Sequence, residues 1–158
     1  MDASRHFLDQ SRWYFSSYYL PRIERCLSQL TDEDVWRRAN DASNSIGNLI
    51  LHLSGNVQQW IIGGVGNLPY TRDREHEFGE RGGFTRAELL AQLKETLAKA
   101  DQVLADVNPD SLLERKEIQG NDVTVMQAIL RIVQHFGLHT GQIMLLTKQY
   151  TGQDLKLS

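Results

Sequence analysis

The chain has 158 residues, of which 41% are hydrophobic and 23% are charged, and its formal net charge is −3. This length suits one domain that can bury a core without help from disulfides or metal. The composition is that of an ordinary globular protein. Acidic and basic residues are mixed along the chain, without a basic tail or a Lys/Arg stripe, which argues against nucleic acid as a partner.

The single cysteine, Cys26, excludes an internal disulfide framework and fits a reducing compartment. Its helical surroundings favour a small apolar filler over a nucleophile. No run reaches the roughly 18 apolar residues that a membrane span needs. The N-terminal residues lack the apolar core of a signal peptide. We therefore expect a cytoplasmic protein that has no membrane partner.

Residues 4 to about 30 carry a broad apolar surface at helical spacing and predict a first helix. Pro21 lies inside this segment and should kink it or start a new turn there, because proline lacks a backbone donor and clashes with the preceding turn. Aromatic residues crowd from Trp13 to Tyr19, more than one core stripe requires. They either fill the core or face a second subunit, since Tyr and Trp are favoured at interfaces.

A second helix is predicted from about residue 44 to 62, with N-cap chemistry from the Ser-Asn-Ser run at 43–45. The glycines at 63, 64 and 66 should end it, because glycine accepts the left-handed conformation at a helix C-terminus. Residues 67–83 then form a long polar loop. Connections of this length often lie over functional sites.

The third helix is predicted to begin at a capping box, Thr85 to Glu88, and to end at Asn108-Pro109. Residues 111–121 form a second connection with a turn at Gly120-Asn121. A second capping box at 124–127 begins the fourth helix, which closes at 150–152. With hardly any alternating strand pattern, the chain predicts an all-α fold, a four-helix bundle. Its long connections leave orders other than up-down-up-down open.

His135 and His139 lie four residues apart on the fourth predicted helix, at the shoulder of its apolar face. His52 lies on a polar edge of the second helix. Because flanks of neighbouring helices meet in a bundle, the three imidazoles could reach one metal ion in a wet cleft beside the core. Gly137 and Gly141 each cost about 1 kcal/mol relative to Ala in mid-helix, which suggests that another backbone or a ligand comes close.

Three imidazoles suit Zn, Ni, Fe or Cu, and three protein ligands plus water is the pattern of catalytic zinc. No spare cysteine exists for a closed structural site, so we expect an open coordination position. The zinc-protease signature needs Glu directly after the first histidine, and Phe136 occupies that place. His6 is expected to be exposed, and His76 to be a solvated loop residue, with a fourth ligand as the alternative.

Three stretches, residues 44–56, 72–78 and 135–142, carry a family resemblance. Their content and order resemble the DinB-like (DinB/YfiT) superfamily of metal-binding four-helix-bundle proteins. The resemblance covers nearly the whole chain. It implies an antiparallel bundle of unusual connectivity, usually a homodimer. It also implies a divalent ion held by one histidine of the second helix and two of the fourth, which match His52, His135 and His139 one for one.

The superfamily includes thiol S-transferases and a mycothiol-dependent maleylpyruvate isomerase. For the divalent ion that the resemblance implies, we expect Zn or Ni first, with Fe or Mn as alternatives, because the ligands are imidazoles. The resemblance also implies a thiol transferase or hydrolase that uses a low-molecular-weight thiol and a small electrophilic substrate.

Four further residues are candidates for the site. Asn56 and Gln142 could support the ligands or orient water, or could make ordinary interhelical hydrogen bonds. Arg72 and Arg74 could clamp an anionic substrate group, or pair with glutamates in a solvated loop.

Two other interpretations stay open. In one, the protein is a non-catalytic, stress-linked dimer that binds a metal or a small molecule. In the other, the bundle is purely structural and its histidines are core residues.

Overall fold

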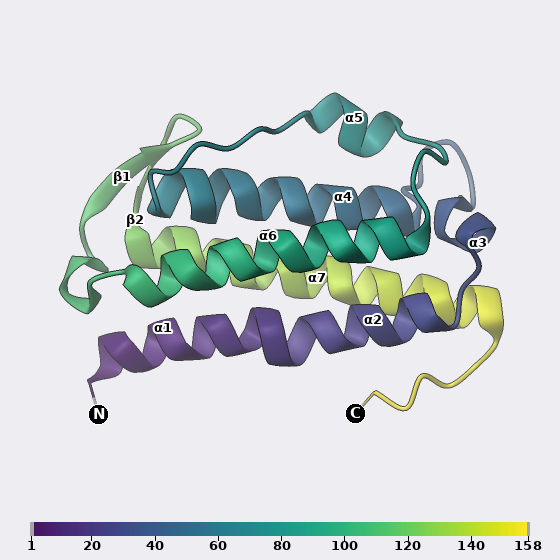
Figure 1. The fold of residues 1–158 in the computed structure, drawn as a ribbon, viewed down its shortest axis with the longest axis horizontal. Coiled ribbons are helices and arrows are strands. Elements are labelled where there is room, and N and C mark those ends of the chain that lie inside the picture. The colour runs from purple at the N-terminus through teal and green to yellow at the C-terminus, as the bar shows by residue number, and fades with distance from the viewer. Residues whose placement is uncertain (1, 158) are drawn as a thin grey trace.

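The computed structural model describes residues 2–157, and it begins with one long helical run (Figure 1). Helix α1 (Ala3–Trp13) passes through a π-helical segment η1 (Tyr14–Tyr19) into α2 (Leu20–Ser28). Pro21 lies in the first turn of α2. The predicted disturbance is therefore a widened π turn just before the proline, which accommodates the missing backbone donor without breaking the run.

A short helix α3 (Asp32–Trp36) leads to α4 (Ile46–Val57), which continues as a π-helical segment η2 (Gln58–Val65). The N-cap of α4 is Ser45, in a capping box completed by Asn48. The chain thus enters this helix within the predicted Ser-Asn-Ser run.

Of the three glycines predicted to end this helix, Gly66 is its C-cap, but with a right-handed φ of −81° in place of the expected left-handed one. Gly63 and Gly64 lie inside η2, and the left-handed residue is Asn67, with φ of 53°. These glycines allow close packing instead: a Cβ on Gly64 would lie 2.6 Å from Cδ1 of Ile118.

The prediction of a structureless loop from 67 to 83 is also wrong, because this segment contains helix α5 (Arg74–Gly79). The Asp73 side chain caps it by accepting a hydrogen bond of 2.9 Å from the backbone N–H of His76. Glu77 is the one buried residue of α5. A helix that buries a single polar residue shows no apolar periodicity, so its pattern resembled that of a loop.

Helix α6 (Arg86–Asp106) begins at the predicted capping box and is followed by a single 3₁₀ turn, η3 (Pro109–Ser111). The next connection is a β-hairpin of strands β1 (Arg115–Ile118) and β2 (Asn121–Thr124). These strands were not predicted, because four residues are too few to display an alternating pattern.

The hairpin turn lies one residue earlier than expected, at Gln119 and Gly120. Their φ values of 54° and 71° are the positive values that a type I′ turn requires.

The last helix, α7 (Val125–Thr151), has the predicted capping box at its start and Gly152, with φ of 65°, at its end. The apolar face of α7 is buried in the core and consists of Val125, Ile129, Ile132, Phe136 and Ile143.

The four long helical runs form a bundle in which α1–α2 and α7 point one way and α4 and α6 point the other (Figure 1). The connection from η2 to α6 runs back along the bundle and lays α5 over α4. The four-helix bundle is therefore confirmed, with up-down-down-up connectivity. No helix within residues 2–157 combines the length and hydropathy needed to cross a membrane.

Helix α4 is covered by α5, α6 and α7, and every one of its residues is buried. His52 on this helix is only 4% exposed. The expectation of a wet polar flank around His52 is corrected accordingly: the polar edge of α4 faces protein.

The aromatic run of the first helix divides between core and surface. Phe15 is buried and packs edge-to-face on Phe136, with ring centroids 5.4 Å apart. Trp13 and Tyr14 remain exposed. Core filling explains Phe15, and a second subunit over the exposed rings stays a prediction.

The two mid-helix glycines of α7 differ in their surroundings. A Cβ on Gly137 would lie 2.7 Å from Oη of Tyr19, whose ring stacks on Phe136. A Cβ on Gly141 would meet nothing within 4 Å. The close neighbour of Gly137 is therefore a side chain and not the backbone expected, and no protein atom approaches Gly141.

Substituting these glycines should change stability in opposite directions. Gly141→Ala should raise the free energy of unfolding by about 0.5–1 kcal/mol, because alanine is the better helix former and the space is free. Gly137→Ala should lower it by about 1 kcal/mol, because the new methyl displaces the Tyr19 ring. Urea denaturation of the two variants measures both effects. Equal stabilisation by both would contradict this account of Gly137.

Candidate metal centre

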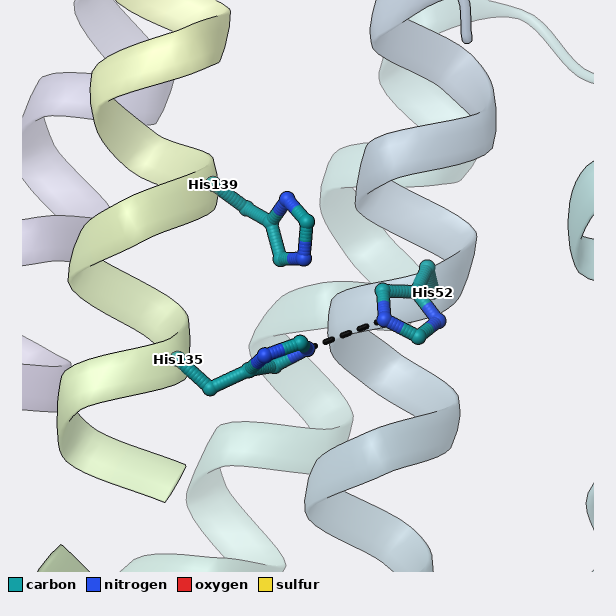
Figure 2. A group of neighbouring side chains, drawn as sticks. All are labelled: His52, His135 and His139. Carbon is teal, nitrogen blue, oxygen red and sulfur yellow. Dashed lines mark hydrogen bonds between the residues drawn. The ribbon is translucent and has the colours of Figure 1, made fainter. Parts of the chain in front are cut away.

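Three histidines from two helices converge between α4 and α7 (Figure 2). The ring of His52 on α4 lies 5.0 Å from that of His135 and 5.1 Å from that of His139, measured between centroids. The two α7 rings are 4.4 Å apart. One ligand nitrogen from each residue lies within 4.8 Å of the other two. The structure thus brings together the three predicted metal ligands.

Glu77 orients the His52 ring and selects its tautomer. Nδ1 of His52 lies 2.9 Å from Oε2 of the Glu77 carboxylate. An ionised carboxylate can only accept, so Nδ1 carries the proton and Nε2 presents its lone pair to the other histidines. This arrangement of carboxylate, imidazole and open nitrogen is the one that orients histidine ligands in metal sites.

Gln142, one of the two predicted supporting residues, orients the His139 ring and selects the same tautomer. Nδ1 of His139 lies 2.6 Å from the amide oxygen Oε1 of Gln142. The amide oxygen accepts, so Nδ1 donates and Nε2 of His139 keeps a free lone pair.

Asn56, the other predicted supporting residue, lies between the helices. Its Nδ2 is 3.0 Å from Nε2 of His135 and 3.3 Å from Nε2 of His52. These two Nε2 atoms are themselves only 2.9 Å apart. His135 can donate to His52 or accept from Asn56 through this atom, but it cannot do both. A cation placed between the imidazoles would take both lone pairs.

The surroundings keep the imidazoles on α7 neutral. Burial, then the neighbouring His139, His52 and Arg72, lower the pKa of His135 to about 4. Burial also lowers the pKa of His139, against the opposing effect of its hydrogen bond to Gln142. Neutral imidazole is the form that binds metals. Near neutral pH an arriving ion would therefore displace no proton from these two side chains.

The donor set fits a divalent transition metal. Nitrogens bound about 2.1 Å from one ion lie about 3.0 Å apart at neighbouring corners of an octahedron and about 3.4 Å apart in a tetrahedron. The Nε2 separation of 2.9 Å between His52 and His135 is close to the first of these values. Among residues 2–157, no cysteine, aspartate or glutamate joins the histidine group as a further ligand.

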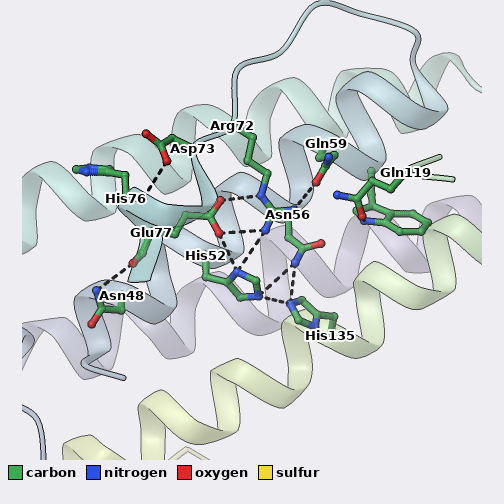
Figure 3. Close-up of polar contacts among 11 residues, drawn as sticks. Asn48, His52, Asn56, Gln59, Arg72, Asp73, His76, Glu77, Gln119 and His135 are labelled. Carbon is green, nitrogen blue, oxygen red and sulfur yellow. Dashed lines mark hydrogen bonds and ion pairs between the residues drawn. The ribbon is translucent and has the colours of Figure 1, made fainter. Parts of the chain in front are cut away.

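A buried ion pair supports His52 from the side away from the α7 histidines (Figure 3). Arg72 donates to both oxygens of Glu77, with Nε 2.7 Å from Oε1 and Nη2 3.0 Å from Oε2. Nη1 of Arg72 also donates to Oε1 of Gln59. The Arg72 and Glu77 side chains are nearly fully buried. Arg72 is thus occupied by protein partners and does not offer a free clamp to substrate.

Glu77 is the residue of this site that sequence reasoning missed. Burial on its own would raise the pKa of the Glu77 carboxyl. Hydrogen bonds from His52 and Arg72 outweigh burial, so the pKa is lowered and the group is ionised.

Gly55 of α4 was the one sequence feature that could have indicated a buried side chain here. A Cβ at that position would collide with Oε1 of Glu77, so the glycine makes room for the carboxylate. Asn48, one turn before His52, holds α5 in place by donating from Nδ2 to the backbone oxygens of Glu77 and Glu80, at 2.9 and 3.0 Å.

The remaining candidates lie away from the three nitrogens. Arg74 is exposed and stacks over Phe78, 5.4 Å from the ring centroid, while Phe78 packs on His52. His76 is exposed on α5 and pairs with Glu80 at 3.7 Å, outside the histidine group. His6 is exposed on α1, as expected.

Comparison with known proteins assigns the chain to a family. A family model described as "Protein of unknown function (DUF1572)" matches residues 2–158. The chain belongs to the DUF1572 family. None of the curated proteins compared with it matches significantly.

Two solved structures resemble the DUF1572 chain in fold. One is a DinB-like protein from Bacillus cereus ATCC 10987, with a TM-score of 0.68 and 16% identity over 85% of this chain and 87% of that one. The other is a conserved protein from Enterococcus faecalis, with a TM-score of 0.72 and 15% identity over 97% and 99% of the two chains. The DinB-like resemblance predicted from the sequence is therefore confirmed at the level of the fold.

Removing the charge of Glu77 should destabilise the DUF1572 bundle even without metal. In Glu77→Gln the guanidinium of Arg72 loses its counter-ion in a buried place, which should cost about 3–5 kcal/mol in the free energy of unfolding. Adding Arg72→Met to this variant should restore part of that loss. Chemical denaturation of metal-free protein measures both.

Glu75→Gln is the matched control, because Glu75 is exposed on the same helix. If Glu77→Gln cost no more than this control, Glu77 would not be the support described here.

Proposed function

We propose that this DUF1572 protein binds one divalent metal ion through His52, His135 and His139, and uses the ion's remaining positions for chemistry on a small substrate. The observation that carries the proposal is the approach of two Nε2 atoms to 2.9 Å. The other nitrogen of His52 is already committed to Glu77. Two lone pairs held this close repel unless a proton or a cation lies between them.

The reaction that suits this site is nucleophilic attack by a low-molecular-weight thiol, or by water, on a small electrophile. A bound divalent ion would supply Lewis acidity, lowering the pKa of a thiol or water molecule attached to it. Three neutral nitrogen donors are compatible with Zn or Ni first, and with Fe or Mn as alternatives. The activity is therefore proposed as that of a thiol S-transferase or a hydrolase.

The chain's own residues would position and shield the reacting groups. Glu77 accepts hydrogen bonds from both His52 and Arg72, so it is a positioning residue and not a free base. The Asn56 amide can turn toward a bound nucleophile once the two imidazoles no longer use its protons. Phe78 lies 4.8 Å from the His52 ring and helps to keep water away from the inner side of the cluster.

Protein purified without a histidine tag should contain about one equivalent of a divalent transition metal per chain, or bind it on addition. His135→Ala and His139→Ala should each lose this metal, because two imidazoles hold an ion far more weakly than three. The matched control is His76→Ala, which removes an exposed histidine outside the cluster. Elemental analysis measures the content. Metal content unaffected by His135→Ala would refute the assigned site and favour a structural role for the histidines.

Metal-loaded protein should catalyse displacement of halide from a halogenated aromatic electrophile by a thiol, with release of halide and a proton, or hydrolysis of an activated ester, faster than a His52→Ala variant treated in the same way. The expected loss in that variant is at least about tenfold, the effect of removing a ligand or its orientation. Product formation is followed by absorbance with Zn, Ni, Fe and Mn in turn and with several thiols. Bound metal without any turnover above the variant would favour the non-catalytic binding protein instead.

A further inference from the structure

A cleft opens beside His135 on the outer side of α7. Its volume is about 480 Å³, and its lining residues are Arg131, Gln134, His135 and Leu138. The cleft therefore shares His135 with the histidine cluster and extends from it toward solvent. The other lining residues have no part in the metal site described above.

Arg131 is held in a defined orientation at this cleft. It lies one helical turn before His135, which places the two side chains on the same flank of α7. Its guanidinium carbon is 4.5 Å from the centroid of the Trp60 ring. Trp60 is itself fixed, because its Nε1 donates a 3.2 Å hydrogen bond to Oε1 of Gln119 in the hairpin turn. Stacking uses the face of a guanidinium and leaves its N–H edges free.

The charge of Arg131 is not compensated. Within residues 2–157, no ion pair or hydrogen bond engages its guanidinium, whereas Arg72 on the inner side of the cluster is fully paired with Glu77. The cleft thus presents free donors next to the histidines. Leu138 adds apolar surface, with 61% of the residue exposed, and Gln134 adds an amide.

We propose that this cleft binds the carboxylate of a small organic acid, with Arg131 as the residue that recognises it. The proposal rests on the metal-centre function in one respect, namely that the reactive carbon of the acid lies at the histidine cluster. One guanidinium matches one carboxylate in a planar two-point contact. A phosphate monoester, with its higher charge, would call for more cationic groups than this cleft contains.

The spacing limits the size of the acid. Side chains one helical turn apart have Cβ atoms about 5–6 Å apart. A molecule that bridges Arg131 and the cluster near His135 is therefore about as long as a substituted benzoate. The apolar surface of Leu138 suits an aromatic or branched aliphatic body between the carboxylate and the reactive carbon.

The test compares benzoate with benzamide, its neutral analogue of the same shape, by ligand-observed NMR titration at low salt. Low salt is needed because screening weakens contacts of exposed charges. Metal-free protein is used first, so that the carboxylate cannot bind through a metal ion. Wild-type protein should bind benzoate at least about tenfold more tightly than benzamide.

The variants separate the charge of Arg131 from its shape. Arg131→Met keeps the length of the stem and should weaken benzoate binding about tenfold while leaving benzamide unchanged. Arg131→Lys should fall between the two, because lysine keeps the charge and loses the two-point contact. The matched control is Arg25→Met, which removes an exposed arginine of α2 and should change neither ligand. Circular dichroism of each variant confirms that it is folded.

Two results would overturn the proposal. One is an unchanged benzoate affinity in folded Arg131→Met. The other is tighter binding of phenyl phosphate than of benzoate in a manner that depends on Arg131. Repeating the titration on Zn-loaded protein keeps the two functional claims apart. Failure to load any of Zn, Ni, Fe and Mn contradicts the metal centre alone, while the metal-free benzoate titration still decides whether Arg131 binds a carboxylate.

Discussion

The structure of the site depends on one buried carboxylate. Glu77 reaches through the gap left by Gly55 and accepts hydrogen bonds from His52 and Arg72 at once. A buried carboxylate without partners would be costly, and so would the buried guanidinium of Arg72. Together they form a neutral pair, and its further hydrogen bonds engage Gln59 and the His52 imidazole. The direction in which His52 presents its Nε2 atom follows from this pair.

The up-down-down-up order of the bundle makes this arrangement possible. Because α4 and α6 point the same way, the chain must return along the bundle between them, and α5 travels over α4 on that return. Helix α4 is consequently buried on all sides. Its polar residues at intervals of four then need partners from other elements. Asn48 hydrogen-bonds to the backbone of α5, His52 to Glu77, and Asn56 to His135. The polar residues of α4 therefore connect α5 on one side to α7 on the other.

The sequence predicted those parts of the site that obey local rules. The spacing of His135 and His139 requires only a helix, and the starts of α6 and α7 follow from their capping boxes. Glu77 was not predicted, because its burial depends on the missing side chain of Gly55. That contact joins segments 22 residues apart in the chain. Helix α5 and the β-hairpin were not predicted for a related reason. Both are too short to show a hydrophobic period, and tertiary contacts hold them in place, for α5 the hydrogen bond from Asn48.

The charge balance of the site explains why its inner and outer sides differ. The opposite charges of Glu77 and Arg72 cancel on the inner side of the cluster. The three ligand candidates are imidazoles, which carry no negative charge. A divalent ion bound there would keep its full charge, because no carboxylate or thiolate of the protein is among the ligands. Such a site lowers the pKa of a bound thiol or water more strongly than one that contains an anionic ligand. Arg131 adds a further positive charge on the outer side. A thiolate or hydroxide at the ion and a carboxylate at the arginine would each supply negative charge that the ligand histidines do not.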